Sequence, residues 1–181
     1  MYKVEQEAPS PVPSQKEEDK VCELTRALNI PSRKLSTAEY RQWICGVESQ
    51  ICEAHVTVDR HSCISEGFKL EEALTPGIYT RELTMPKGSL VFSRIHMETH
   101  PFMIVKGLVS VYDGSSVQSL EAPYKGVTKA GTKRVLYVHE DTTWITFHPT
   151  EMEVLEDIDR GDTITCDTFE EYEKHFLESR L

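Results

Sequence analysis

The sequence predicts a mainly β protein, an antiparallel β-barrel or jelly roll with helices before it and a short helix after it. Eight short runs of β-favouring residues follow one another between residues 77 and 149, separated by proline, glycine or acidic turns. Parallel strands would be expected to alternate with helices. No helical pattern interrupts these runs, so the strands are predicted to be antiparallel. The predicted strands are Ile78–Thr84, Leu90–His96, Phe102–Val105, Leu108–Tyr112, Val117–Glu121, Tyr124–Thr128, Arg134–His139 and Thr142–His148.

The part of the chain before the strands divides into two segments. Residues 1–17 are rich in proline, serine and charged residues, a composition that predicts disorder. Residues 18–75 form a predicted helical extension, with a short first helix over Glu17–Leu28. A clearer helix begins at a capping box of Ser36 and Glu39. An apolar stripe follows at helical spacing and needs a partner, either the outer face of the β domain or a second subunit: Tyr40, Trp43, Ile44, Val47 and Ile51.

The strands occupy a predicted domain of residues 76–149, and an acidic extension of residues 150–181 follows it. This extension carries eleven acidic residues against three lysines and arginines. A terminal helix is expected to begin near Asp167. Phe169, Tyr172 and Phe176 are spaced to form one stripe along it, which is typical of a docked helix rather than a solvated tail.

Charge and composition exclude several classes of partner. The formal net charge of the 181-residue chain is −10 at pH 7, and residues 21–149 are electrically balanced. A broad basic surface is therefore missing, and nucleic acid is not an expected partner. No apolar run approaches the roughly 20 residues that span a bilayer, so no membrane association is expected. Five scattered cysteines without a CxxC motif predict free thiols in a reducing compartment, the cytoplasm.

Three motifs in the strand region carry a family resemblance. They are PGIYTRE at Pro76–Glu82, AGTKR at Ala130–Arg134 and HEDTTWITFH at His139–His148. Residues 77–149 resemble a cupin, and more closely the small cupin-type proteins encoded by tailed bacteriophages. This resemblance implies a cupin barrel, a location in the host cell cytoplasm and a homodimer, since isolated cupins usually pair through sheet edges that would otherwise stay open.

The metal motifs of cupins match this chain only in part. A metal-binding cupin supplies two histidines two residues apart, a carboxylate about four residues later, and a further histidine after a PxG glycine. Aligned on Gly107, the first three positions fall at Arg94, His96 and His100; aligned on Gly131, the last falls at Arg134. Arginine stays protonated and cannot hold a cation. The resemblance therefore implies a reduced site.

A third histidine could complete this reduced site. His148 lies on a later predicted strand, on the parity of Trp144 and Thr146. If that face points inward, His148 converges with His96 and His100. Three imidazoles suit zinc, iron, nickel or copper with open coordination positions.

A metal-free interpretation stands beside this one. Strand alternation places Arg94 on the same side as His96, and Arg134 lies near the barrel interior, where a charge needs a partner. That partner could be Glu82, Glu98 or a bound carboxylate, phosphate or sulfate, because arginine pairs such groups in bidentate fashion. Tyr79 could add a polar group to the pocket. His139, beside the Glu140-Asp141 turn, is expected at the surface.

Three functional classes are compatible with these residues. The chain could be a metal-dependent enzyme acting on a small molecule, with His96 and His100 as ligands. It could be a non-catalytic module that captures a small anionic ligand. It could also be a structural or interaction protein that uses the barrel as a scaffold for its ends. The sequence leaves enzyme and non-enzyme both open.

Overall fold

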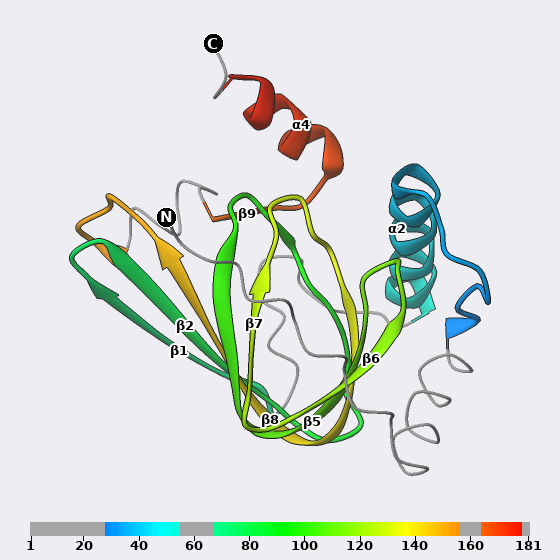
Figure 1. Cartoon of the computed structure of the whole chain (residues 1–181), viewed down its shortest axis with the longest axis horizontal. Helices are drawn as coiled ribbons and strands as arrows, with labels where there is room; N and C mark the ends of the chain where they lie inside the picture. Colours follow the sequence, from blue (N-terminus) through cyan, green and yellow to red (C-terminus); the bar gives the residue numbers. More distant parts are fainter. Residues whose placement is uncertain (1–27, 55–66, 156–163, 179–181) are drawn as a thin grey trace, which may run out of the picture.

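The structure is a computed structural model that describes residues 28–54, 67–155 and 164–178 (Figure 1). Seven strands form one antiparallel sheet in the order β1-β2-β8-β5-β6, with β3 paired to β8 and β7 to β5. Two short strands, β4 and β9, form a second antiparallel sheet. The strands are β1 Lys69–Thr75, β2 Ile78–Met85, β3 Leu90–Phe92, β4 Ile95–His96, β5 His100–Tyr112, β6 Val117–Glu121, β7 Tyr124–Thr128, β8 Val135–Pro149 and β9 Thr165–Cys166. The predicted fold class, mainly β and antiparallel with flanking helices, is confirmed.

Two long strands build both layers of the fold. The first half of β5 pairs with β7 and its second half with β6, while β8 pairs first with β3 and then with β2. Each long strand joins two runs that the sequence predicts as separate strands. Register shifts between β5 and β8 fall around Gly107, whose φ is +90°. A Cβ at Gly107 would lie 2.5 Å from the carbonyl oxygen of Asp141, so the two backbones cross there at close range.

The main core lies between the two layers. Ile104 and Trp144 come from the halves of β5 and β8 on one side, and Val109 and Val138 from the halves on the other. Phe102 stacks on Trp144 with ring centroids 4.4 Å apart. This apolar filling occupies the middle of the fold and leaves the polar inward-facing residues at one end of the sheet.

Helix α2, Thr37–Ala54, packs against the outer side of one layer. Its predicted capping box is present: the Ser36 N–H donates to Glu39 Oε2 at 2.8 Å, and the Glu39 N–H donates to Ser36 Oγ at 3.4 Å. The apolar stripe packs with Tyr112 and Val135 of the sheet. Its partner is therefore the β domain, so the stripe gives no support to a subunit interface.

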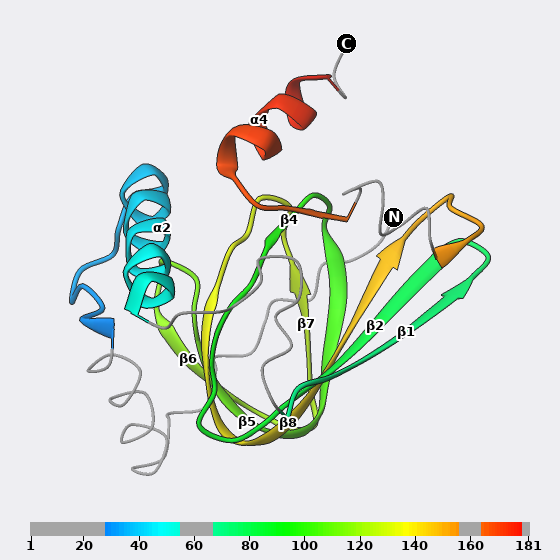
Figure 2. The same cartoon turned by 180° about the vertical axis from the view of Figure 1, so that it is seen from behind.

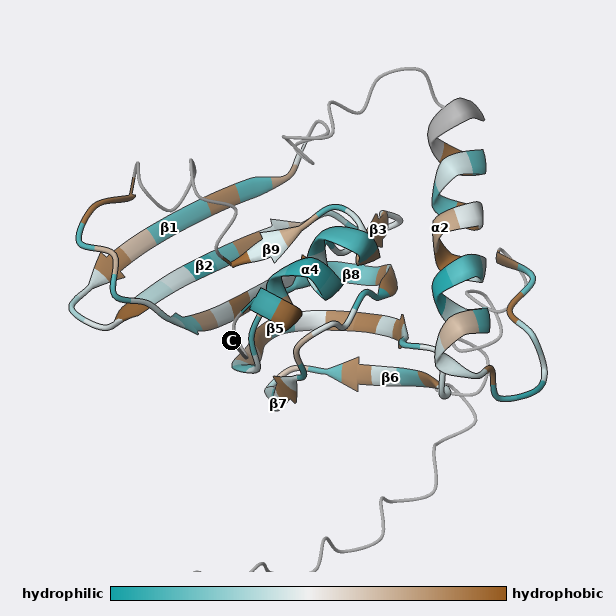
Figure 3. Ribbon diagram, turned by 90° about the horizontal axis from the view of Figure 1, so that it is seen from above, coloured by the Kyte–Doolittle hydropathy of each residue, from teal (hydrophilic) through white to brown (hydrophobic). Residues whose placement is uncertain are grey.

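Helix α4, Phe169–Glu178, follows β9 and lies over one end of the sheet, whereas α2 stands at its side (Figure 3). The Glu171 N–H donates to Thr168 Oγ1 at 3.2 Å and caps the helix. Phe169 and Tyr172 pack on the cluster of Ile95, Met97 and Cys166, so the predicted docking is confirmed for these two aromatic residues. Among the described residues, neither helix is long and apolar enough to cross a bilayer.

One part of the predicted extension is wrong. Residues 69–75, assigned to the helical segment 18–75, form strand β1 at the edge of the sheet. Their side chains are mostly exposed, so Lys69–Thr75 has no need of the apolar alternation that marks a half-buried strand. The expected disorder of residues 1–17 and nearly all of the expected helix Glu17–Leu28 lie outside the described residues.

Candidate metal centre

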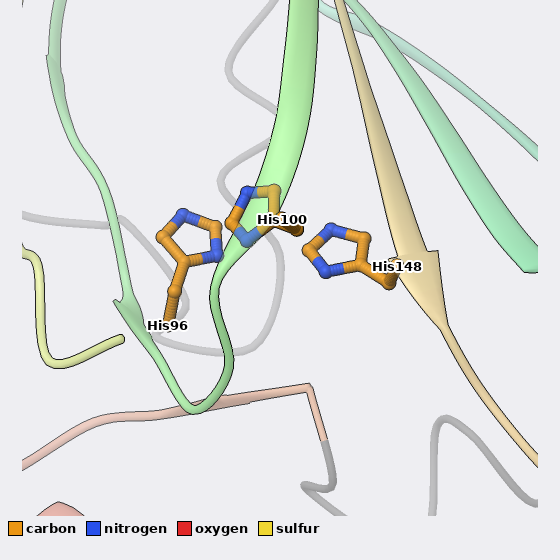
Figure 4. A group of neighbouring side chains, drawn as sticks. All are labelled: His96, His100 and His148. Carbon is orange, nitrogen blue, oxygen red and sulfur yellow. The ribbon is translucent and has the colours of Figure 1, made fainter. Parts of the chain in front are cut away.

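Three histidines from three strands meet at one end of the sheet (Figure 4). The ring centroids of His96 and His100 are 4.4 Å apart, and those of His100 and His148 are 4.1 Å apart. The side chain of His100 therefore lies between the other two. One ring nitrogen from each histidine lies within 4.8 Å of the other two. Among the histidine, cysteine and carboxylate side chains of the described residues, these three histidines form the group that could hold a metal ion.

Strand register explains the meeting of His100 and His148. His100 begins β5 and His148 lies next to the end of β8, and these two strands run antiparallel, with Phe102 opposite Thr146. Because side chains two residues apart share a face, His100 and His148 follow on the same inward face. His148 therefore lies beside His100 on the face that strand parity predicts, and its role as a ligand stays a prediction.

The third histidine is held through its backbone. His96 ends β4 and pairs with Thr165 of β9. Figure 2 shows β4 below the orange segment that leads into α4. The His96 N–H donates to the Thr132 carbonyl at 3.3 Å, and the Gly131 N–H donates to the His96 carbonyl at 2.8 Å. These contacts from two separate segments hold the backbone of His96, and its imidazole lies against the ring of His100.

Two buried ring nitrogens in this group lack hydrogen bonds. Nδ1 of His100 lies 3.1 Å from the Glu98 carbonyl oxygen, which can only accept. The proton of His100 is therefore on Nδ1, and Nε2 presents a lone pair. Neither Nε2 of His100 nor Nδ1 of His96 has a partner among the described residues. Buried polar atoms are rarely left unsatisfied, and a bound ion is a recognised reason for such an exception.

The imidazoles are held in the neutral form that binds metals. Burial lowers the pKa of His96 well below 6.5, and the neighbouring His100, His148, Arg134 and Arg81 lower it further. Burial also lowers the pKa of His100, against the opposing effect of its hydrogen bond to the Glu98 carbonyl. The pKa of His148 falls to about 3, mainly through burial and then through His100 and Arg81. At neutral pH all three rings are neutral, so each has one unprotonated ring nitrogen that can bind a metal.

The donor set fits a first-row transition metal. Three nitrogens at the zinc–nitrogen distance of about 2.0–2.1 Å lie roughly 3.3–3.6 Å from one another. The nitrogens here lie within 4.8 Å of one another, so side-chain movements of about 1 Å bring them into range. Three imidazoles leave one or more coordination positions for water or a ligand.

Neighbouring polar groups orient the histidine on β8. Nε2 of His148 shares a 3.0 Å hydrogen bond with Thr146 Oγ1. Such contacts behind a metal ligand fix its ring orientation. The ring of Tyr79 lies 6.0 Å from that of His148, and the Tyr79 hydroxyl donates to the Glu72 carboxylate. The predicted polar role of Tyr79 therefore has a structural counterpart beside the candidate centre.

The two predicted arginines, Arg94 and Arg134, lie in surroundings that differ from each other. Arg134 is partly buried, with its guanidinium carbon 5.3 Å from the centre of the Phe102 ring. Arg94 points instead to Asp167, with Nε and Oδ1 2.9 Å apart. The alternation used to place Arg94 beside His96 is wrong, because the strand is interrupted at Ser93-Arg94 between β3 and β4.

Two further residues differ from their predicted positions. Glu98 is exposed in the turn before β5 and faces the site with its backbone carbonyl instead of its carboxylate. His139, expected at the surface, is 8% exposed and shares a 2.7 Å hydrogen bond with Ser110. The β8 strand continues through Glu140-Asp141, so His139 lies within a strand rather than at a turn.

Sequence reasoning missed Arg81. Its side chain shares the inward face of β2 with Tyr79, opposite Thr146 of β8, and its charge lowers the pKa of His148. Nε of Arg81 lies 3.4 Å from Glu72 Oε1. The signal was the spacing of two residues from Tyr79 in the PGIYTRE motif, which places both side chains on one face.

Comparisons with known proteins find similar folds only among solved structures. No family model matches the sequence, and no curated protein matches it. A cupin superfamily protein from Desulfitobacterium hafniense is 8% identical, with a TM-score of 0.42, 49% of this chain and 82% of that chain covered. KdgF from Halomonas sp. is 16% identical (TM-score 0.41; 52% and 87% covered). An acetylacetone dioxygenase from Acinetobacter johnsonii is also 16% identical (TM-score 0.41; 52% and 72% covered). With scores below 0.5, these likenesses assign no activity to this chain.

Proposed function

We propose that this protein binds one divalent transition metal through His96, His100 and His148 and uses it to bind a small molecule in the β domain. One observation carries the proposal. Three neutral imidazoles from separate strands converge in the interior, and ring nitrogens of His96 and His100 lack any hydrogen-bond partner among the described residues. Zinc, iron, nickel and copper all accept this donor set.

The chain's own residues would prepare the site in three ways. The Glu98 carbonyl selects the tautomer of His100 that directs Nε2 to the metal. Thr146 orients the ring of His148. Burial keeps the imidazoles unprotonated near neutral pH. When bound, the metal would act as a Lewis acid and polarise an oxygen atom of the small molecule, as metal ions do in metal-dependent enzymes.

Metal analysis of the purified full-length chain tests the proposal. We expect about one metal per chain after dialysis against each candidate ion in turn, and a large loss in a His96→Ala/His100→Ala variant. A His148→Gln variant provides a second test should the double variant fail to fold. His175→Ala, at an exposed position on α4, is the matched control and should retain the metal. A folded wild-type protein that takes up none of the four metals would contradict the proposal.

We also propose that the chain is a phage-type protein of the host cytoplasm and forms a homodimer. The three motifs PGIYTRE, AGTKR and HEDTTWITFH support the phage-type assignment. The dimer is supported by the open edge of β1, which pairs only with β2 among the described strands. Light scattering should give twice the chain mass of 20.7 kDa. A monomer at all concentrations tested would refute the dimer.

A further inference from the structure

A small cavity lies beside the candidate metal centre, between the two layers of the sheet. Its volume is about 210 Å³, and its walls include Phe102, Tyr124, Gln118, Asp113 and Arg134. Phe102 lies two residues after His100 on the same face of β5, so the cavity is adjacent to the histidines along the strand. Pockets for drug-sized ligands are about 300–1,000 Å³. This cavity therefore suits a smaller molecule.

Arg134 provides the cavity with a partly buried positive charge. Burial lowers its pKa, but a guanidinium stays protonated in proteins. Arg81 has an ion pair with Glu72, and Arg94 has one with Asp167. Within the described parts of the chain, the guanidinium of Arg134 has no ion pair with a carboxylate, and its contact is the face of the Phe102 ring. A buried charge without a counter-ion is costly, so this position calls for an anion.

The other charges around the cavity also favour a bound anion. The three histidines are neutral and offer no compensation, and a divalent metal would add two positive charges next to Arg134. Asp113, at another wall of the cavity, accepts hydrogen bonds from the Ser115 N–H and hydroxyl, at 3.1 and 2.6 Å. Its negative charge raises the pKa of Arg134 against the effect of burial, but its Oδ1 is used within its own turn and it has no ion pair with the guanidinium among the described residues. The charge of the cavity and metal together is best balanced by a ligand that carries a negative group.

We infer that this cavity is the subsite for a carboxylate group of the small molecule that binds at the metal centre, and that Arg134 pairs with it. The inference rests on the proposed function, because the metal is what the rest of the molecule would contact. A planar guanidinium matches a carboxylate through two parallel hydrogen bonds. One guanidinium balances one negative charge. Apolar walls at Phe102, Val111 and Leu120 suit the organic part of a carboxylic acid better than inorganic phosphate.

Calorimetric titration with matched pairs of probes tests the inference. Acetate, oxalate and benzoate are compared with their neutral amides and with inorganic phosphate, at constant ionic strength, on protein of measured metal content. We expect at least one carboxylate to bind, with its amide at least tenfold weaker. Arg134→Gln should weaken that carboxylate at least tenfold while the metal content is unchanged. Arg94→Gln, which removes a half-exposed arginine paired with Asp167, is the matched control and should bind as the wild type.

A second variant covers the case in which Arg134→Gln does not fold. Gln118 lines the cavity at an exposed position, so Gln118→Glu should fold and place a negative charge beside the carboxylate. It should weaken carboxylate binding and leave the amides unaffected.

The outcomes separate the two proposals. Metal-loaded protein that binds acids and amides equally, that prefers phosphate, or that keeps full carboxylate affinity in both variants would overturn the subsite and leave the metal proposal standing. Protein that takes up no metal would contradict the proposed function. In that case a carboxylate preference that depends on Arg134 would still support the subsite.

Discussion

The buried histidines make the metal-free protein sensitive to acid. In the folded chain, the pKa of His148 is lowered from 6.5 to about 3 by burial and by the nearby His100 and Arg81. Above about pH 6.5, the histidine is neutral in both the folded and unfolded states, and the full stability is present. As the pH falls below that value, His148 is protonated in the unfolded chain but stays neutral in the folded chain. The free energy of unfolding must therefore decrease.

The size of this effect follows from the two pKa values. For His148 alone, linkage gives a loss of up to about 2 kcal/mol between about pH 7 and about pH 5. Burial lowers the pKa of His96 and of His100 as well, so their contributions have the same sign. A change of 2 kcal/mol moves a urea midpoint by roughly 1 M for a typical slope.

Urea unfolding of chelator-treated protein at the two pH values measures the effect. His148→Gln removes the titrating group and retains a polar side chain beside Thr146, so its loss of stability between the two pH values should be smaller by about 2 kcal/mol. His175→Gln, at an exposed position of α4, serves as the control and should follow the wild type. Equal losses in the wild type and His148→Gln would refute the reasoning.

Three further outcomes are expected. Saturation with a bound metal at a hundred times its Kd should stabilise the folded chain by about 2.7 kcal/mol, raise the Tm by roughly 5–10 °C and be reversed by a chelator; an unchanged Tm would count against the site. Gly77→Ala should cost about 1–2 kcal/mol, because φ is +84° and no atom lies within 4 Å of the new Cβ. Gly107→Ala adds a clash with the Asp141-Thr142 backbone and should cost more than about 3 kcal/mol in the same urea assay, so equal costs would contradict the close crossing. Tyr40→Phe should cost about 1–3 kcal/mol, since its hydroxyl donates to the Lys133 carbonyl at 2.7 Å; a smaller loss would mean that water replaces this contact.

Local patterns in the sequence were sufficient for most elements and for the three histidines. The capping box at Ser36 and the alternation in β2, β6 and β7 depend on neighbouring residues, which the sequence displays directly. His148 could be placed because strand β8 is uninterrupted from Trp144 to His148, so parity gave the correct face. His96 and His100 were found by their spacing, although the structure sets their separation with a turn rather than a continuous strand.

The errors come from contacts between distant segments. Arg94 was misplaced because Asp167, far along the chain, holds its guanidinium and because the strand breaks just before it. β1 was missed because an edge strand with exposed side chains has no apolar pattern to detect. The spacing from Tyr79 places Arg81 on the same face of β2, but its position opposite Thr146 depends on which strand pairs with β2, and the sequence does not show that pairing directly. Long-range pairing decides these positions, and no local rule substitutes for it.

The pairing of β4 with β9 sets an order of events during synthesis. His96 is held by a strand whose partner, Thr165, lies far downstream, whereas His100 and His148 belong to strands that pair within the main sheet. A growing chain can assemble that sheet while residues 164–172 are still inside the ribosome. Its third imidazole is secured only when the downstream segment emerges. Under the proposed metal-binding function, the complete ligand set therefore forms only after the sheet that surrounds it has folded.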